Sequence, residues 1–214
     1  MTDKEHILAV GDLHARYDLL RKVLDELAPG LASPLRMVFL GDYIDRGPEA
    51  RQILERLLDL ARRRPDTVFL LGNHERMLLD ALEGRRVPLF LNNGGRETLA
   101  SYGLPPERIA ELPAAHQAFL RAMPLYHQTD DYIFVHAGLR PGLPLEQQDE
   151  ADLLWIRHEF IYSEAGFGKT VVFGHTPLDQ PLVRPGRIGI DTGAVYGNHL
   201  TCLELPQMRF HTLT

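Results

Sequence analysis

The sequence predicts an α/β fold in which parallel strands alternate with helices. Three short apolar runs, at 6–10, 37–40 and 67–71, each end at a glycine. The two segments between these runs carry apolar residues at helical spacing. Strands that alternate with helices at this interval are typical of βαβ units with a parallel core. We therefore expect the polar residues that follow each glycine to meet at the carboxyl edge of one sheet.

The remaining elements follow in order along the chain. The first helix is expected over 16–27, and Pro48 opens the second at a position that proline favours. Helical segments broken by turns fill 85–124, which we interpret as a helical cap within a single domain of residues 1–214. A second group of strands is expected at 132–135, 170–173, 187–190 and 200–205.

Composition limits the class of protein. A chain of 214 residues that is 44% hydrophobic suits one compact domain with a full core. A net charge of −6 argues against binding to a nucleic-acid backbone. A single cysteine, Cys202, excludes an internal disulfide and favours a reducing compartment, so we expect a cytoplasmic protein. No apolar stretch has the length of a membrane span, and we expect a monomer that does not bind membranes.

Five polar motifs follow the predicted strands. They are Gly11-Asp12-Leu13-His14, Gly41-Asp42-Tyr43-Ile44-Asp45-Arg46-Gly47, Gly72-Asn73-His74-Glu75, His136-Ala137-Gly138 and Gly174-His175-Thr176. Taken alone, a Gly-Asp after a strand is usually a turn, and a single histidine is usually a hydrogen-bonded core residue. Five such motifs in sequence, each after an apolar run, instead predict a hydrolase that uses two metal ions.

Six residues of these motifs supply candidate metal ligands: Asp12, His14, Asp42, Asn73, His136 and His175. Asp42 ends the central strand, so we expect its carboxylate to bridge two ions, with Asp12 and His14 on the first. The other three ligands would complete the second ion. Carboxylate, imidazole and amide oxygen together favour manganese, iron or zinc over calcium. Two ions about 3.5–4 Å apart can activate a bridging water and hold a tetrahedral phosphate.

Four further residues fit the needs of a phosphate substrate rather than of a metal. Arg46 and Arg157 can bind phosphate oxygens through two parallel hydrogen bonds. His74 follows Asn73 and is placed to protonate the leaving oxygen. Asp45 could hold its imidazole and keep it cationic.

Together the motifs resemble the phosphoprotein phosphatase family of metallophosphoesterases, especially its small bacterial and bacteriophage serine/threonine phosphatases. The similarity runs from Gly11 to Leu205 and includes Asn93-Gly94-Gly95 and Ile190-Asp191-Thr192-Gly193-Ala194-Val195. The resemblance implies a calcineurin-like sandwich of two mixed β-sheets flanked by helices. It also implies two divalent metal ions, which in bacterial members are often manganese.

The resemblance also implies a role for each site residue. It places Asp12, His14 and Asp42 at one metal, and Asp42, Asn73, His136 and His175 at the other. It makes His74 the general acid and Asp45 its partner, with Arg46, Asn73, His74 and Arg157 around the phosphate. Family members hydrolyse phosphoserine and phosphothreonine proteins in one in-line step, with a metal-bridging water as nucleophile. One departure is Ala15, where the family usually has glycine.

Two alternatives to a protein phosphatase remain open. A symmetrical bis(5'-nucleosyl)-tetraphosphate hydrolase, or another small-molecule phosphoesterase, would use similar ligands. Such hydrolases typically lack the Asp-Arg pair after the second motif and carry Asn-His-Asp at the third, so Asp45-Arg46 and Glu75 favour the protein phosphatase. A non-enzymatic scaffold would be expected to have lost a ligand or the acid, and here none is lost. We therefore expect phosphorylated proteins or peptides as substrates.

Overall fold

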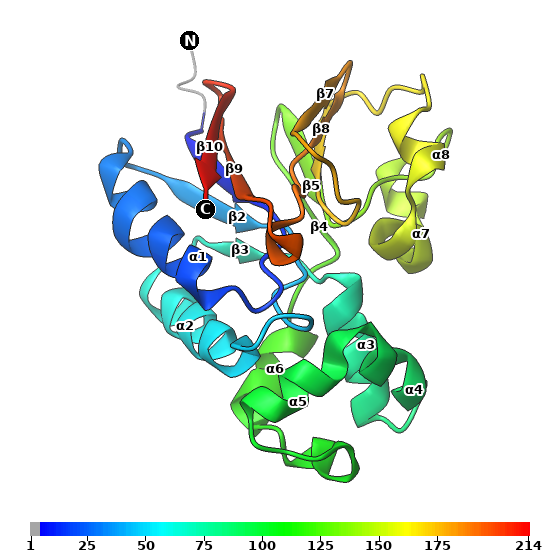
Figure 1. Cartoon of the computed structure of the whole chain (residues 1–214). Helices are drawn as coiled ribbons and strands as arrows, with labels where there is room; N and C mark the ends of the chain where they lie inside the picture. The colour runs from blue at the N-terminus through cyan, green and yellow to red at the C-terminus, as the bar shows by residue number, and fades with distance from the viewer. Residues whose placement is uncertain (1–4) are drawn as a thin grey trace.

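The computed structural model describes residues 5–214, which form two five-stranded sheets packed face to face between helices (Figure 1). The first sheet has the order β10-β9-β1-β2-β3. Its strands are β1 (Ile7–Val10), β2 (Arg36–Phe39), β3 (Val68–Phe69), β9 (Leu200–Leu205) and β10 (Arg209–Leu213). β1, β2 and β3 run parallel, whereas β9 is antiparallel to both β1 and β10.

The second sheet has the order β4-β5-β6-β8-β7. Its strands are β4 (Tyr126–Gln128), β5 (Tyr132–Val135), β6 (Thr170–Phe173), β7 (Leu182–Arg184) and β8 (Arg187–Gly189). β5, β6 and β8 run parallel, and the two edge strands pair antiparallel. The predicted sandwich of two mixed sheets is therefore confirmed. Every strand expected from the sequence is present, but the sequence analysis did not predict the edge strands β4, β7 and β10.

The inner strands β1, β2, β5 and β6 are largely apolar because the sandwich buries both faces of each sheet there. In β1, Leu8 and Val10 pack in the cluster that includes the outer helices, while Ile7 and Ala9 pack against the second sheet. Beyond the second sheet, Val135 and its neighbours form another apolar layer with the helices on that side. Each fully buried aliphatic side chain contributes roughly 1.5–3 kcal/mol. The core thus fixes the strand ends on which the motifs lie.

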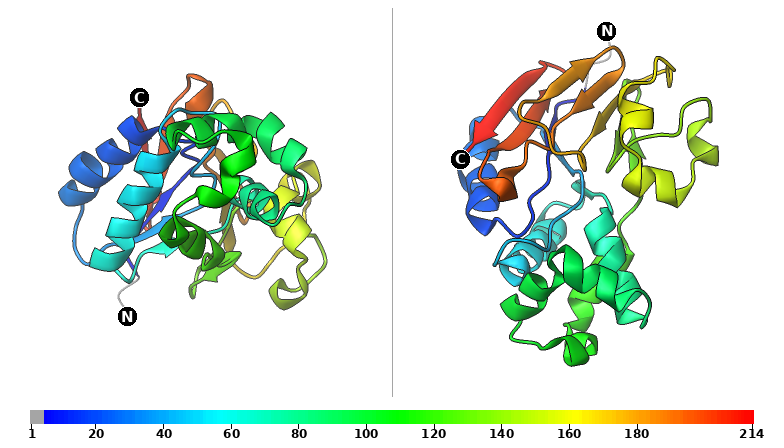
Figure 2. Two further views of the ribbon diagram at one scale, coloured as in Figure 1. Left: turned by 90° about the horizontal axis from the view of Figure 1, so that it is seen from below. Right: turned by 45° about the vertical axis from the view of Figure 1, so that its right-hand side comes forward.

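Helices cover both outer faces of the sandwich (Figures 1 and 2). The first sheet is covered by α1 (Tyr17–Arg21), which continues into the π-helix η1 (Lys22–Leu27) and the short turn η2 (Ala28–Gly30), and by α2 (Ala50–Arg63). The second sheet is covered by the turn η5 (Leu145–Gln147) and by α7 (Glu150–Trp155) and α8 (His158–Ile161). Within residues 5–214, no helix has the length and apolarity needed to cross a membrane.

The segment expected to form a cap is helical and lies at one end of the sandwich (Figure 1). It follows α3 (Asn73–Leu82) and contains α4 (Val87–Phe90), η3 (Leu91–Gly95), α5 (Arg96–Ser101), η4 (Pro106–Glu111) and α6 (Ala114–Arg121). Its buried residues Phe90, Leu99 and Leu120 belong to the same apolar cluster as the first sheet. The cap therefore packs on the sheet end where the motifs lie.

Candidate active site

The motif residues occupy tight turns at the carboxyl ends of the strands. Among the described residues, eight non-glycine residues have positive φ, and six of these are His14, Ala15, Asp42, Asp45, Arg46 and His175. A non-glycine residue in the left-handed backbone conformation costs about 1–3 kcal/mol, and such residues tend to cluster at functional sites. Ala15 has a φ of 57°, a backbone conformation that favours glycine, so an alanine here carries some strain.

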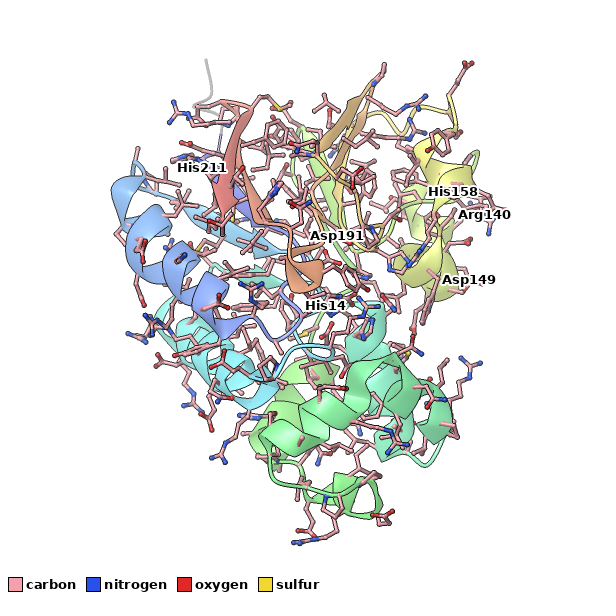
Figure 3. The ribbon with its side chains drawn as sticks, in the orientation of Figure 1. His14, Arg140, Asp149, His158, Asp191 and His211 are labelled. Carbon is pink, nitrogen blue, oxygen red and sulfur yellow. The ribbon has the colours of Figure 1, made fainter. Side chains whose placement is uncertain are left out.

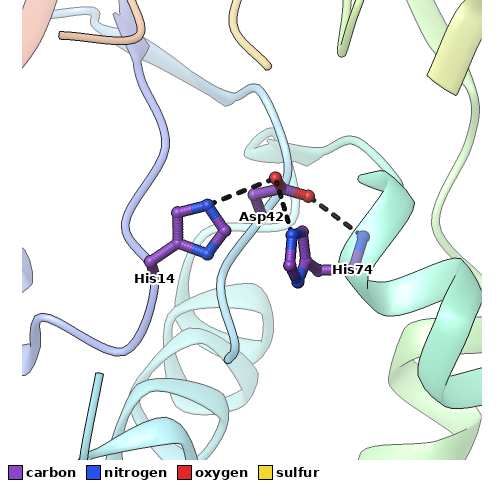
Figure 4. Close-up of side chains that lie close together, drawn as sticks. All are labelled: His14, Asp42 and His74. Carbon is purple, nitrogen blue, oxygen red and sulfur yellow. Dashed lines mark hydrogen bonds and ion pairs between the residues drawn. The ribbon is translucent and has the colours of Figure 1, made fainter. Parts of the chain in front are cut away.

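The carboxylate of Asp42 is the centre of the cluster. Its Oδ2 lies 3.4 Å from His14 Nε2 and 3.9 Å from His74 Nε2, and its Oδ1 lies 3.3 Å from His136 Nε2. Figure 4 shows His14 and His74 directed at Asp42 from two sides. Burial alone would raise the pKa of Asp42, but the surrounding histidines hold it well below its usual range. Asp42 is therefore an anion with several imidazole nitrogens around it.

Hydrogen bonds to carbonyl groups fix which ring nitrogens carry protons. His14 Nδ1 donates to Ile44 O and His136 Nδ1 donates to Leu40 O, both at 2.9 Å. Burial lowers the pKa of His14 to about 3 and also lowers the pKa of His136. With its proton on Nδ1, each neutral ring leaves Nε2 as an acceptor 3.3–3.4 Å from the Asp42 carboxylate. Acceptors that converge in this way suit a cation between them, and a carbonyl partner of this kind is typical of metal-ligating histidines.

Asn73, His175 and Asp12 extend the cluster on its other side. Asn73 Oδ1 lies 2.8 Å from His136 Nε2 and 2.9 Å from His175 Nδ1. The backbone N–H of His175 donates to Asp12 Oδ2 at 3.0 Å. Asp12 Oδ1 is buried and has no hydrogen-bond partner among residues 5–214. Burial, Asp191 and Asp42 raise the pKa of Asp12.

Among the described residues, two groups of three histidine or aspartate side chains could hold metal ions, and they share Asp42. The first is His14, Asp42 and His74, and the second is Asp42, His136 and His175. The donors fit two divalent ions because buried oxygens and ring nitrogens converge around Asp42. The second contains three of the four ligands that the sequence analysis assigned to one ion, all except Asn73. The first includes His74 where the sequence analysis expected Asp12, although the unpartnered oxygen of Asp12 remains available as a ligand.

His74 is also part of a buried chain that leads into the cap. Its Nδ1 donates to Asp45 Oδ2 at 2.7 Å, and Asp45 Oδ1 accepts from the hydroxyl of Thr98 at 2.5 Å. Although burial would lower the pKa of His74, the carboxylates of Asp42 and Asp45 raise it above its usual value. The geometry therefore supports a protonated imidazole whose ring orientation Asp45 fixes.

The two arginines lie on different sides of the cluster. Arg46 Nη1 donates to His14 Nε2 at 2.6 Å, and Arg157 Nε donates to His175 Nε2 at 3.1 Å. Each guanidinium thus touches one of the two candidate metal groups. The structure therefore joins all ten residues singled out from the sequence into one network.

The sequence analysis gave no structural role to Glu75, which proves central to the backbone of the site. Its Oε1 accepts from the N–H groups of Tyr43 and Ile44, and its Oε2 accepts from those of Asp42 and Gly72, at 2.8–3.2 Å. Burial and the charge of Asp42 raise the pKa of Glu75 to about 8. The position of Glu75 in the first turn of α3 was the available signal, because this position often accepts backbone N–H groups. The partner turn around Asp42 could not be inferred from the sequence.

Known proteins resemble this chain over nearly its whole length. The asymmetrical bis(5'-nucleosyl)-tetraphosphatase PrpE of Geobacillus sp. (strain WCH70) is 30% identical to it, over 93% of this chain and 90% of that protein. The protein of the same name from Halalkalibacterium halodurans is 27% identical, with 94% and 90% covered.

Solved structures share the fold. A candidate diadenosine tetraphosphatase superposes with a TM-score of 0.73 at 21% identity, covering 99% of this chain and 94% of that one. A serine/threonine phosphatase from Saccharomyces cerevisiae gives a TM-score of 0.67 at 17% identity, with 99% and 80% covered. The sequence profile of the calcineurin-like phosphoesterase family matches residues 5–204. The chain therefore belongs to the calcineurin-like phosphoesterase family, and it is a hydrolase whose clustered histidine and aspartate side chains could bind metal ions.

Proposed function

We propose that this chain hydrolyses dinucleoside tetraphosphates and splits the four phosphates unequally between the two nucleosides. One observation carries the proposal: relatives that match over nine-tenths of both chains are named asymmetrical bis(5'-nucleosyl)-tetraphosphatases. The sequence analysis ranked a serine/threonine protein phosphatase first and a small-molecule phosphoesterase second. The relatives support the substrate class of the second hypothesis better, with asymmetrical rather than symmetrical cleavage.

The chemistry of the site suits a polyphosphate. Asp12, His14 and Asp42 would hold one ion, and Asn73, His136 and His175 would complete the second around Asp42. When bound, two divalent ions polarise a phosphoryl group and lower the pKa of a water molecule. Manganese is the first ion to test, because the mixed carboxylate and imidazole donors accept it.

The remaining residues act on the substrate itself. Arg46 and Arg157, which contact different candidate metal groups, would bind successive phosphates from two sides. His74 would donate its Nε2 proton to the leaving oxygen, while Asp45 holds the opposite ring nitrogen. In an unequal cleavage the leaving group would be a nucleoside triphosphate or monophosphate.

A protein phosphatase is the second candidate, and the His74–Asp45–Thr98 chain favours it. A serine or threonine alkoxide is a poor leaving group and gains most from a proton donor, whereas a phosphate leaving group needs little protonation. These buried hydrogen bonds extend from His74 through Asp45 to Thr98 in the cap, and they fix the orientation of the His74 imidazole.

One assay separates the two candidates. Metal-stripped protein re-supplied with Mn²⁺ is tested on diadenosine tetraphosphate and on a phosphoserine peptide, with products separated by chromatography. We expect kcat/KM to favour the dinucleotide at least about tenfold, which corresponds to 1.4 kcal/mol of transition-state binding. The products should be AMP and ATP in equal amounts. A preference for the phosphopeptide would restore the protein phosphatase, and two molecules of ADP would indicate symmetrical cleavage.

A further inference from the structure

Two exposed aromatic side chains lie beside the arginines of the candidate site. Tyr196 is 62% exposed, and the Arg46 guanidinium lies 5.5 Å from the centre of its ring. Trp155 is 42% exposed, and its ring meets that of His175 edge to face at 5.9 Å. Tyrosine and tryptophan are enriched at binding surfaces because each combines an apolar ring with a polar atom, so two of them beside one site are candidates for contact with a ligand.

Tyr196 is held on a rigid turn. It ends η6 (Ala194–Tyr196), which Gly193 and Gly197 flank with positive φ. Its N–H donates to Gly193 O at 2.9 Å, and Arg16 Nη1 donates to Ala194 O at 2.8 Å from across the fold. A fixed ring with exposed surface loses little entropy when a flat ligand stacks on it.

Trp155 has a comparable position on the other side. It is the last residue of α7, and two residues later Arg157 donates to His175, the same histidine that the indole contacts. Figures 1 and 2 show η6 and α7 apart from one another on either side of the sheet ends that carry the site. Each aromatic ring is thus linked to one arginine and one candidate metal group.

We propose that Tyr196 and Trp155 are stacking platforms for the two nucleobases of a dinucleoside polyphosphate. This inference rests on the proposed function and names the residues that select nucleosides for it. A phosphate bound by Arg46 places its adjoining nucleoside within reach of Tyr196, and the same relation links Arg157 to Trp155. Stacking on an aromatic face accepts any base, so the platforms select for a nucleoside without reading which base it carries.

Steady-state kinetics of single variants test the platforms. Tyr196→Ala and Trp155→Ala should each raise KM for diadenosine tetraphosphate about 5- to 150-fold, the range for loss of one stacked base. The inhibition constant of inorganic tripolyphosphate, which has no base, should change far less. Tyr196→Phe and Trp155→Phe should restore binding, because each keeps an aromatic face. Equal losses of affinity for the dinucleotide and for tripolyphosphate would contradict base stacking on Tyr196 and Trp155. They would not contradict the proposed function.

Tyr162 provides a matched control. It is also 62% exposed and carries an arginine, Arg184, 5.3 Å from its ring centre, but that arginine is on β7 and not in the site. Tyr162→Ala should leave KM for the dinucleotide unchanged. If Tyr162→Ala raised this KM as much as Tyr196→Ala does, the effect would be common to exposed aromatic residues, and the proposal would be wrong.

Fluorescence gives a readout that does not depend on turnover. Trp155 is the only tryptophan of the chain, so tryptophan fluorescence, excited at a wavelength that tyrosine does not absorb, reports on this platform alone. AMP should quench it, whereas ribose 5-phosphate, which has the sugar and phosphate without the base, should not. Equal quenching by both would overturn stacking at Trp155. A wild-type enzyme that hydrolyses phosphopeptides and ignores dinucleotides would instead overturn the proposed function, and this inference with it.

Discussion

Strand β1 has a histidine–carboxylate cluster at each end, and the two clusters differ in how their charges are paired. At its start, His6 Nε2 lies 3.0 Å from Glu204 Oε1, and His211 Nε2 lies 2.9 Å from Glu204 Oε2. At its end lie Asp12 and His14, next to Asp42. Figure 3 labels His211 and His14, which lie in different parts of the molecule.

At the first cluster every carboxylate oxygen has a donor, and Arg209 adds a further positive charge 3.4 Å from Glu204. At the second cluster the Nε2 acceptors of His14 and His136 lie 3.3–3.4 Å from the Asp42 carboxylate, and Asp12 Oδ1 has no partner among the described residues. Similar residue types therefore serve two purposes. A surplus of buried acceptors, rather than the presence of histidine and carboxylate, distinguishes a cation site from a structural ion pair.

The largest expected difference between the clusters follows from removing their central carboxylates. Asp42→Asn should abolish binding of both ions, because the two candidate groups share this residue. Phosphoesterase activity should fall by at least about 10³-fold, since metal ions supply several kcal/mol of transition-state stabilisation. Elemental analysis measures the ion content, with Glu204→Gln as the control that keeps both ions. Full retention of two ions by Asp42→Asn would refute the shared carboxylate.

The next effect separates the proton donor from the ligands. His74→Asn should lower turnover of a phosphoserine peptide by about 10²-fold or more, the lower range for loss of general acid catalysis. The loss should be smaller on an aryl phosphate, whose leaving group needs little protonation. Equal losses on both substrates, together with a lower metal content, would make His74 a ligand, as its position near His14 and Asp42 allows.

A smaller effect is expected where a carboxylate acts only through the backbone. Glu75→Gln replaces an acceptor with an amide donor that faces backbone N–H groups, so the turn that carries Asp42 should loosen. We expect metal affinity to fall about 10- to 100-fold, as for other residues that orient ligands. Titration with Mn²⁺ measures the dissociation constant, and Glu97→Gln, on the exposed face of α5, is the matched control. Unchanged affinity would show that the backbone holds Asp42 without Glu75.

The sequence allowed the strands and the site residues to be predicted for the same physical reason. Strands buried on both faces are continuous apolar runs, so the glycine and the polar residues after each run stand out. The edge strands β4 and β7 lack this signal because they are short and partly exposed. Thr98 also carried no signal, since its bond to Asp45 depends on how the cap packs rather than on local sequence. Contacts between distant turns therefore required the structure.

The smallest effect concerns the paired cluster at the start of β1. Burial would raise the pKa of Glu204, but the hydrogen bonds from His211 and His6 and the charge of Arg209 lower it. A carboxylate with a lowered folded-state pKa stabilises the fold above its unfolded pKa of about 4.3, and this contribution is lost as the pH falls through the folded-state value. Glu204→Gln should therefore cost about 1–3 kcal/mol of unfolding free energy at pH 7 and much less near pH 3. Urea unfolding at both pH values measures the difference. A penalty that does not depend on pH would mean that Glu204 contributes through packing, and the contrast between paired and unpaired charge at the two ends of β1 would then lose its electrostatic basis.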